Sequence, residues 1–209
     1  MTDSRVDLAS GSVSRETFAR LQALESLVKR WTPAINLVSK ASLPQLWDRH
    51  IVDSAQVFWI APTGAHWVDL GSGGGFPGLV VAILAVEHAP DMRVTLVESD
   101  LRKATFLRQA AQALTVPVTV RTERIDQVSP LLADVLSARA LASLPDLLAY
   151  AERHLKPGGL AVFPKGTKHA EEVALARKDW AFDHDSVQSL SEPEAAILKI
   201  RNLHRATNV

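Results

Sequence analysis

The sequence contains no cysteine, and this absence excludes several kinds of site at once. Without a thiol, the chain has neither a disulfide framework, nor a thiolate zinc site, nor a cysteine nucleophile. Methylation at C5 of a pyrimidine needs that nucleophile and is therefore excluded. The seven histidines show no metal-ligand spacing, so we expect no metal site.

The chain also lacks an excess of charge of either sign. Lys+Arg and Asp+Glu both number 23, which gives a formal net charge of zero. Proteins that grip naked nucleic acid through its phosphates are usually basic. Any role on nucleic acid must therefore depend on a local patch.

Long apolar runs are missing as well. None approaches the ~20 residues that cross a membrane, and no secretory signal peptide is recognisable. We therefore expect a cytoplasmic protein without membrane contact. A chain of 209 residues is long enough for one domain with a substantial core and appended helices.

One glycine-rich stretch, residues 68–78, organises the rest of the chain. It reads VDLGSGGGFPG and precedes the apolar segment LVVAILAV. The pattern predicts a buried strand, a tight glycine turn and a helix. Glycines permit positive φ and close approach of a ligand, and the free N–H groups of a helix start suit a nucleotide-like group.

The same letters fit two cofactor motifs. Gly73-x-Gly75-x-x-Gly78 matches the dinucleotide fingerprint, which is a weak signal alone. Asp69-x-Gly71-x-Gly73 matches the acidic first motif of S-adenosylmethionine (SAM) enzymes. The carboxylate of Asp69 would repel a pyrophosphate, and it suits a ligand with an ammonium and a sulfonium, directly or through a neighbour. SAM is favoured.

The pattern along the chain predicts three segments: a flexible N-terminal tail (1–13), a helical cap (14–62) and a SAM-binding domain (63–209), the last two forming one unit. In the cap, a helix starts near Ser14 and ends at Pro33, a second runs over 44–59, and residues 62–64 form a turn.

Strands and helices alternate after the glycine stretch. We expect strands over 93–98, 118–121, 134–137 and 160–163, helices over 101–114, 144–155 and 169–178, and a final antiparallel pair over 182–190 and 195–203. Such alternation implies an α/β, doubly wound, Rossmann-like parallel sheet. The terminal antiparallel hairpin fits a class I SAM-dependent methyltransferase better than a dehydrogenase.

Acidic and apolar residues follow the second and third of these strands. Glu98 stands where such folds place a carboxylate that accepts hydrogen bonds from ribose hydroxyls, a role shared by NAD and SAM sites. Ile125 could lie against an adenine and Asp126 could bind its amino group, but an ordinary loop explains this pair equally well.

Two basic residues follow the fourth and fifth strands. Arg139 could meet a carboxylate or an RNA phosphate, and an ordinary surface ion pair is equally compatible with the sequence. Lys165 occupies a similar edge, where it could help to position a substrate or, with Lys168 and His169, form a basic rim.

Common motifs of related enzymes are absent. The Asn/Asp-Pro-Pro-aromatic motif of many base amino-methylating enzymes is replaced by SARA at 137–140, and Tyr150 lacks the lysine partner of short-chain dehydrogenases. Guanine N7 carries a lone pair and no proton, so its methylation needs orientation rather than a general base. The sequence is consistent with that acceptor.

Several segments together resemble the bacterial 16S ribosomal RNA guanine-N7 methyltransferases, the glucose-inhibited division protein B family. They span most of the chain: NLVS at 36–39, RHIVDS at 49–54, DLGSGGGFPG at 69–78, RK at 102–103, FLR at 106–108, RALASL at 139–144 and KG at 165–166. The Gly-Phe-Pro-Gly and Arg-Ala-x-Ala-Ser-Leu segments are far more specific than the glycines.

The resemblance implies SAM-dependent methylation of N7 of a guanosine in the decoding region of 16S rRNA, with S-adenosyl-L-homocysteine as the other product. It carries SAM contacts onto Gly71, Phe76, Ile125, Asp126 and Arg139. The expected partner is 16S rRNA within the small ribosomal subunit or an assembly intermediate. Two alternatives stay open: a small-molecule SAM methyltransferase and a non-catalytic SAM-binding regulatory module. His50 and Asp53, three residues apart on a helix, either face the site or pack the helix.

Overall fold

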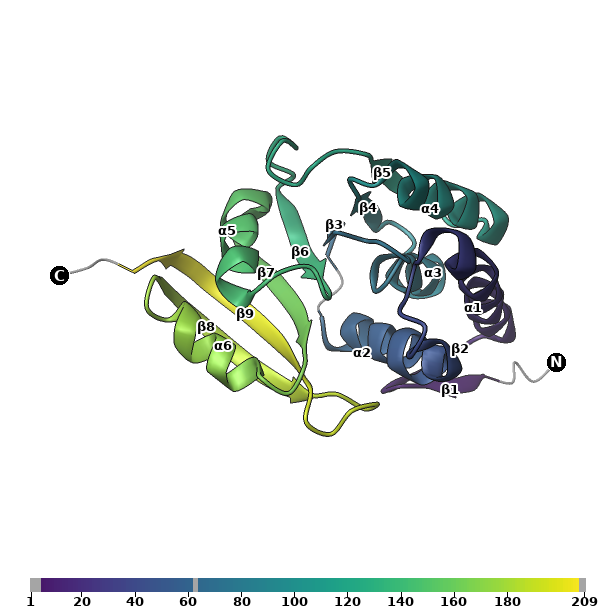
Figure 1. The fold of residues 1–209 in the computed structure, drawn as a ribbon, viewed down its shortest axis with the longest axis horizontal. Coiled ribbons are helices and arrows are strands. Elements are labelled where there is room, and N and C mark those ends of the chain that lie inside the picture. Colours follow the sequence, from purple (N-terminus) through teal and green to yellow (C-terminus); the bar gives the residue numbers. More distant parts are fainter. Residues whose placement is uncertain (1–4, 62–63, 207–209) are drawn as a thin grey trace.

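A seven-stranded sheet forms the centre of the computed structural model, which describes residues 5–61 and 64–206 (Figure 1). The strand order is β5-β4-β3-β6-β7-β9-β8. The first five of these run parallel, and β9 is antiparallel to both β7 and β8. In that order the strands are Thr119–Arg121, Arg93–Val97, His66–Leu70, Ala133–Ala138, Leu155–Lys165, Ala196–Arg205 and Trp180–Gln188. The predicted doubly wound sheet with a terminal antiparallel hairpin is confirmed.

Helices cover both faces of the sheet. α1 (Arg15–Ile35), α2 (Asp53–Ile60), α3 (Gly78–His88) and α4 (Leu101–Leu114) pack on one face, and α5 (Leu144–His154) and α6 (His169–Ala176) on the other. Figure 1 shows these two groups at opposite ends of the view. Neighbouring strand residues such as Val162 and Phe163 belong to opposite cores, because side chains alternate along a strand.

The expected flexible tail over residues 1–13 is wrong for its second half. β1 (Val6–Leu8) and β2 (Gly11–Val13) pair as an antiparallel hairpin. Leu8 and Val13 are buried, and the Nε1 group of Trp59 donates a hydrogen bond to the Leu8 carbonyl at 3.1 Å. The sequence did not indicate this hairpin, because most residues of the segment are small and polar and only Leu8 and Val13 are buried apolar residues. Residues 1–4 lie outside the described residues.

The first cap helix begins as expected and ends later. The Ser14 hydroxyl accepts a hydrogen bond from the Thr17 N–H at 3.1 Å, so Ser14 is the N-cap of α1. Pro33 lies inside the last turn instead of ending the helix. Because Pro33 has no N–H, the Lys29 carbonyl lacks its helical hydrogen bond, and Lys29 is exposed to water. Asn36 ends the helix in the left-handed conformation.

The second cap helix changes pitch along its length. It begins with the 3₁₀ turn η1 (Leu43–Gln45), continues as the π-helical segment η2 (Trp47–Val52) and ends as α2. π-helical turns are rare and are frequently found at functional sites. The predicted turn at 62–64 falls largely outside the described residues.

The fifth parallel strand is longer than expected. β7 follows α5 without a gap, so the Pro157–Gly159 stretch lies inside the strand and not before it. The pairing of β7 with β6 shifts register there, between Ala133 and Val135. The first residues of β7 do not alternate between apolar and polar side chains, so the sequence could not indicate that the strand begins there.

Candidate active site

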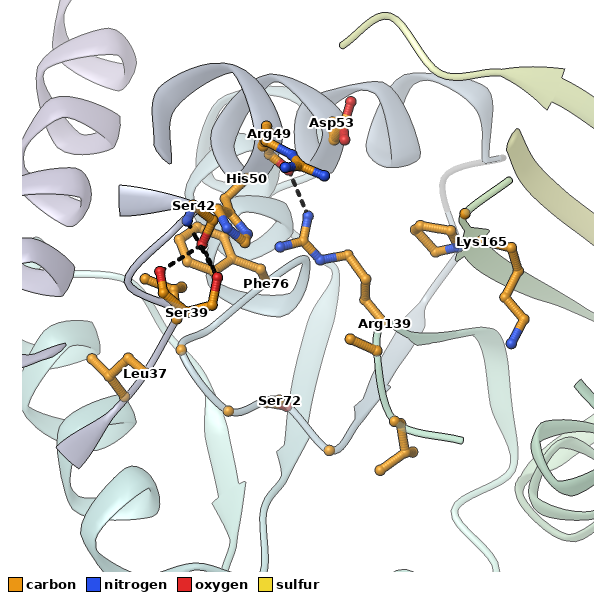
Figure 2. Close-up of a pocket in the computed structure, with 18 of the residues that line it drawn as sticks. Leu37, Ser39, Ser42, Arg49, His50, Asp53, Ser72, Phe76, Arg139 and Lys165 are labelled. Atoms are coloured by element: carbon orange, nitrogen blue, oxygen red, sulfur yellow. Dashed lines mark hydrogen bonds between the residues drawn. The ribbon is translucent and has the colours of Figure 1, made fainter. Parts of the chain in front are cut away.

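A cavity of about 890 Å³ opens at the carboxyl ends of the parallel strands, as expected for an open α/β sheet. Figure 2 shows its cap side, with η2 above the glycine loop. The lining comes from the cap, the strand ends and the turn between β8 and β9. It includes seven of the eight predicted cofactor residues: Gly71, Gly73, Phe76, Glu98, Ile125, Asp126 and Arg139. Lys165, His50 and Asp53 line it too.

The glycine loop after β3 is shaped by backbone geometry and close packing. Gly71 has φ 65°, and a Cβ at this position would lie 2.7 Å from Cδ1 of Leu141. Gly73 has φ 51°, and a Cβ there would meet only the Gly71 carbonyl, at 3.7 Å. The loop therefore needs glycine for its conformation, and at Gly73 it leaves open space for a ligand.

Asp69 lies behind this loop and does not line the cavity. Its side chain is fully buried, its Oδ1 accepts a hydrogen bond from the Ser137 hydroxyl at 2.7 Å, and its Oδ2 accepts one from the Gly78 N–H at 3.3 Å. Burial raises the pKa of Asp69 to about 6, against the lowering effect of these bonds. A direct contact between Asp69 and a ligand in the cavity is therefore blocked by the loop, and only the route through hydrogen-bonded neighbours is left for this carboxylate.

Ser137 is the residue that the sequence reasoning missed in this network. It is fully buried at the end of β6 and also accepts a hydrogen bond from Nε1 of Trp67, at 2.9 Å. A hydroxyl inside the apolar run ADVLSA was the available signal, because a buried polar group requires a partner.

Glu98 lines the cavity and is only 8% exposed. Its two carboxylate oxygens accept hydrogen bonds from the N–H groups of Gly73 and Asp100, both at 2.8 Å. These bonds fix the carboxylate against the glycine loop. A carboxylate has about four acceptor sites, so it can still accept bonds from a diol in the cavity.

Ile125 and Asp126 lie after β5, on the same side of the cavity as Glu98. The Ile125 carbonyl is 3.1 Å from Nε2 of the buried His154, and burial lowers the pKa of that imidazole. Asp126 pairs with Arg124 at 3.2 Å on the surface side of the loop. The structure thus brings this loop to the cavity, with an apolar and an acidic side chain available for a heterocycle.

Arg139 reaches across the cavity from the end of β6. Its Nη1 donates a hydrogen bond to the Arg49 carbonyl at 2.8 Å, and its guanidinium carbon lies 5.6 Å from the centre of the Phe76 ring (Figure 2). Burial, together with the nearby Arg49, lowers the pKa of Arg139 to about 10, so it stays positively charged at neutral pH.

Lys165 is held by neighbouring groups. Its ammonium lies 2.6 Å from the Glu172 carboxylate and donates to the Ala142 carbonyl at 3.0 Å. The same carboxylate accepts a bond from the Leu144 N–H. The charge of Lys165 is therefore compensated, and its contacts fix the segment that follows Arg139.

The cap contributes a wall that the sequence indicated only at His50 and Asp53. The His50 ring packs on Phe76 with centroids 5.0 Å apart, and neither of its buried ring nitrogens has a hydrogen-bond partner among the described residues. Asp53 accepts a bond from the Ser189 hydroxyl at 3.0 Å, and Arg49 pairs with Glu192 at 2.9 Å. These contacts join the cap to the β8–β9 turn, a long-range pairing that sequence reasoning missed.

The residues present fit SAM. The cavity is near the upper end of the roughly 300–1,000 Å³ of small-molecule sites, which leaves room for a nucleoside and a second group. Glu98 offers acceptors for ribose hydroxyls beside an open glycine loop. Within residues 5–61 and 64–206 no group of three or more acidic or histidine side chains could hold a metal ion, and no helix of that part is long and apolar enough to cross a membrane.

Comparisons with known proteins agree with this geometry. The fold is similar to the crystal structure of the N-methyltransferase NodS from Bradyrhizobium japonicum WM9 in complex with S-adenosyl-L-homocysteine, with a TM-score of 0.53, 15% identity, and coverage of 90% of this chain and 99% of that one. This likeness shows the class I SAM-dependent methyltransferase fold.

The sequence relatives identify the family. Proteins named ribosomal RNA small subunit methyltransferase G from Ruegeria sp. (strain TM1040) and Ruegeria pomeroyi are 54% and 56% identical, over 98% and 93% of this chain and 100% and 95% of their own lengths. The profile of the family described as rRNA small subunit methyltransferase G matches residues 17–201. The chain therefore belongs to the rRNA small subunit methyltransferase G family.

Proposed function

We propose that this protein transfers the methyl group of SAM to N7 of a guanosine in the decoding region of 16S rRNA. One observation carries the proposal: in a chain of this family, one cavity has two sides of different chemistry, and the first side suits a nucleoside. The first half contains Glu98 and the loop of Ile125 and Asp126. The second lies between the cap and the β8–β9 turn.

Seven residues are proposed to contact the cofactor directly. Glu98 accepts from the ribose hydroxyls, Ile125 and Asp126 meet the adenine, and Gly71, Gly73, Phe76 and Arg139 surround the methionine part. Asp69 supports them from behind by fixing Ser137 and the start of α3. When bound, SAM supplies an electrophilic methyl group.

The acceptor chemistry requires little from the protein. Guanine N7 offers a lone pair without a proton, so the residues must orient the base and exclude water rather than remove a proton. Lys165 contributes indirectly, because its bonds to Glu172 and Ala142 hold the segment after Arg139. The target base must be unpaired or flipped to enter the cavity.

The substrate is proposed to be the small ribosomal subunit or an assembly intermediate, in the cytoplasm. A formal net charge of zero supports recognition of a preformed particle over tight binding to arbitrary RNA. The cap and the sheet act as one structural unit in this proposal, since both line the cavity.

The test is nucleoside mass analysis of 16S rRNA from subunits that lack this methylation, after incubation with the protein and SAM. We expect one new 7-methylguanosine in the decoding region. SAM binding without modification would support a regulatory module. Methyl transfer to a metabolite, with no label in rRNA, would support a small-molecule enzyme.

A further inference from the structure

The strand order divides the cavity into two halves. Glu98 and the loop of Ile125 and Asp126 follow β4 and β5 at one side of the sheet, so the nucleoside of the cofactor belongs there. The other side is bounded by the end of β7, the start of β9 and the first turn of α2. We call this second side the acceptor half, since the group that receives the methyl must lie opposite the nucleoside.

Two cations that border the acceptor half are paired with carboxylates, whereas the charge of Arg139 meets the Arg49 carbonyl and the Phe76 ring. Arg49 pairs with Glu192 at 2.9 Å and Lys165 with Glu172 at 2.6 Å. Asp53 lines the same region, yet it forms no ion pair within the described ranges 5–61 and 64–206. Its Oδ1 accepts a hydrogen bond from the Ser189 hydroxyl of the β8–β9 turn at 3.0 Å, and Ser191 of the same turn is a further polar neighbour.

A carboxylate in this position favours an incoming group that donates hydrogen bonds or carries positive charge. Burial raises the pKa of Asp53, with a further rise from Glu192, against the opposing bonds from Ser191 and Ser189. The ionised form is thus less stable here than in water, and a cationic or donating ligand would relieve that cost. Acceptor sites remain on the carboxylate, which has about four.

Guanine has both properties during the reaction. Its Watson–Crick edge carries the N1–H and N2–H₂ donors, on the side of the ring away from N7. As methylation proceeds, the N7 lone pair forms the bond to the methyl carbon, and the carbon–sulfur bond breaks with its electron pair going to sulfur. The positive charge passes from sulfur to the purine, and no proton moves at N7.

We propose that Asp53 reads the target base: its carboxylate accepts hydrogen bonds from N1–H and N2–H₂ of guanine and stabilises the positive charge that the purine acquires. The inference rests on the proposed function. Adenine presents a lone pair at N1, which the carboxylate repels, so Asp53 also excludes adenine. Sites built around such hydrogen bonds reject analogues that lack them by as much as about 10⁴-fold.

Asp53→Asn tests the charge with little change of shape. We expect single-turnover methylation of unmodified small subunits to slow on the order of 10²-fold, as for loss of one group that stabilises developing charge. The Kd for SAM, measured by calorimetry, should stay at the wild-type value, because Asp53 lies outside the nucleoside half. The Tm should fall by no more than a few degrees, since the amide oxygen of asparagine can still accept the Ser189 bond. Asp48→Asn is the matched control: Asp48 is exposed on the same helical segment and does not line the cavity.

Ser189→Ala separates base reading from support of the turn. It removes the hydroxyl bond to Asp53 and keeps the charge, so we expect a loss of less than about tenfold. Equal losses of rate in both variants, or a wild-type rate in Asp53→Asn, would overturn the inference about Asp53. The proposed function would still stand in either case, because the unaltered protein methylates the subunit. Failure of the unaltered protein to methylate the subunit would overturn both.

Discussion

At the scale of single residues, a buried hydrogen-bond network lies behind the cavity lining. Trp67, Ser137, Asp69 and the Gly78 N–H form a continuous chain of hydrogen bonds from the sheet to the start of α3. A Cβ on Gly78 would lie 2.7 Å from Oδ2 of Asp69, so this approach requires glycine. The acidic start of the motif thus connects the end of β6 to the start of α3, and we expect its effect on binding to be indirect.

Asp69→Asn should weaken SAM binding. An amide keeps one oxygen, so either Ser137 or the Gly78 N–H loses its acceptor, at about 1–3 kcal/mol for a buried unpaired group. We expect the Kd for SAM, measured by calorimetry, to rise by roughly 10- to 100-fold on that basis. An unchanged Kd would show that the network does not shape the loop. Asp91→Asn, at an exposed position, is the control.

Arg139→Ala should abolish most activity in a protein that still folds. Its hydrogen bond to the Arg49 carbonyl and its contact with Phe76 place the guanidinium across the cavity. Its loss should lower kcat/KM on small subunits by on the order of 10²-fold, with a Tm within a few degrees of wild type. Full turnover would reduce Arg139 to a structural link between β6 and the cap.

At the scale of secondary-structure elements, the sequence predicted helices and strands that have a periodic apolar pattern. It missed structure that depends on contacts between segments far apart in the chain. The helix over 101–114 was predicted with its observed bounds, because its apolar spacing is a local signal. The β1–β2 hairpin was missed, since two short strands become stable only against Trp59, some 50 residues later. The cavity residues at strand ends were predictable. The β8–β9 hairpin was also predicted, but its docking on the cap was not, because that docking depends on tertiary contacts.

Glu87 makes the N-terminal hairpin sensitive to acid. Although burial raises its pKa, hydrogen bonds from Thr17, Ser14 and Arg5 hold that pKa at about 2. Since the folded-state pKa is below the unfolded value, the stabilisation is complete above an unfolded pKa near 4.3 and is lost as the pH falls towards 2.

Glu87→Gln should therefore lower the Tm at pH 7 and flatten its fall between about pH 4.5 and 2. Thermal unfolding followed by circular dichroism across this range measures the effect. Glu123→Gln, with a side chain 44% exposed, serves as control. If the variant kept the wild-type pH dependence, the hairpin contacts would not be coupled to this carboxylate.

At the scale of the whole molecule, the zero net charge bears on how the protein recognises its substrate. A chain with 23 basic and 23 acidic residues has no general electrostatic attraction for RNA. We expect methylation of intact small subunits to exceed that of free 16S rRNA by more than about tenfold in kcat/KM, because binding then relies on shape rather than phosphate contacts. Competition with unrelated RNA at moderate salt should leave the rate on subunits unchanged. Equal rates on both substrates would contradict this view.

The contact between the cap and the β8–β9 turn has a consequence for folding during synthesis of the protein. Arg49 and Glu192 stand 143 positions apart, and β9 lies between β7 and β8 in the sheet. Synthesis proceeds from the N-terminus, so the cap is made long before the β8–β9 turn that it contacts. The cavity cannot close until the segment through residue 197 has left the ribosome. Until then the nascent chain lacks the wall of the cavity that Ser189, Glu192 and Ile197 provide, so we expect methyl transfer to begin only when translation is nearly complete.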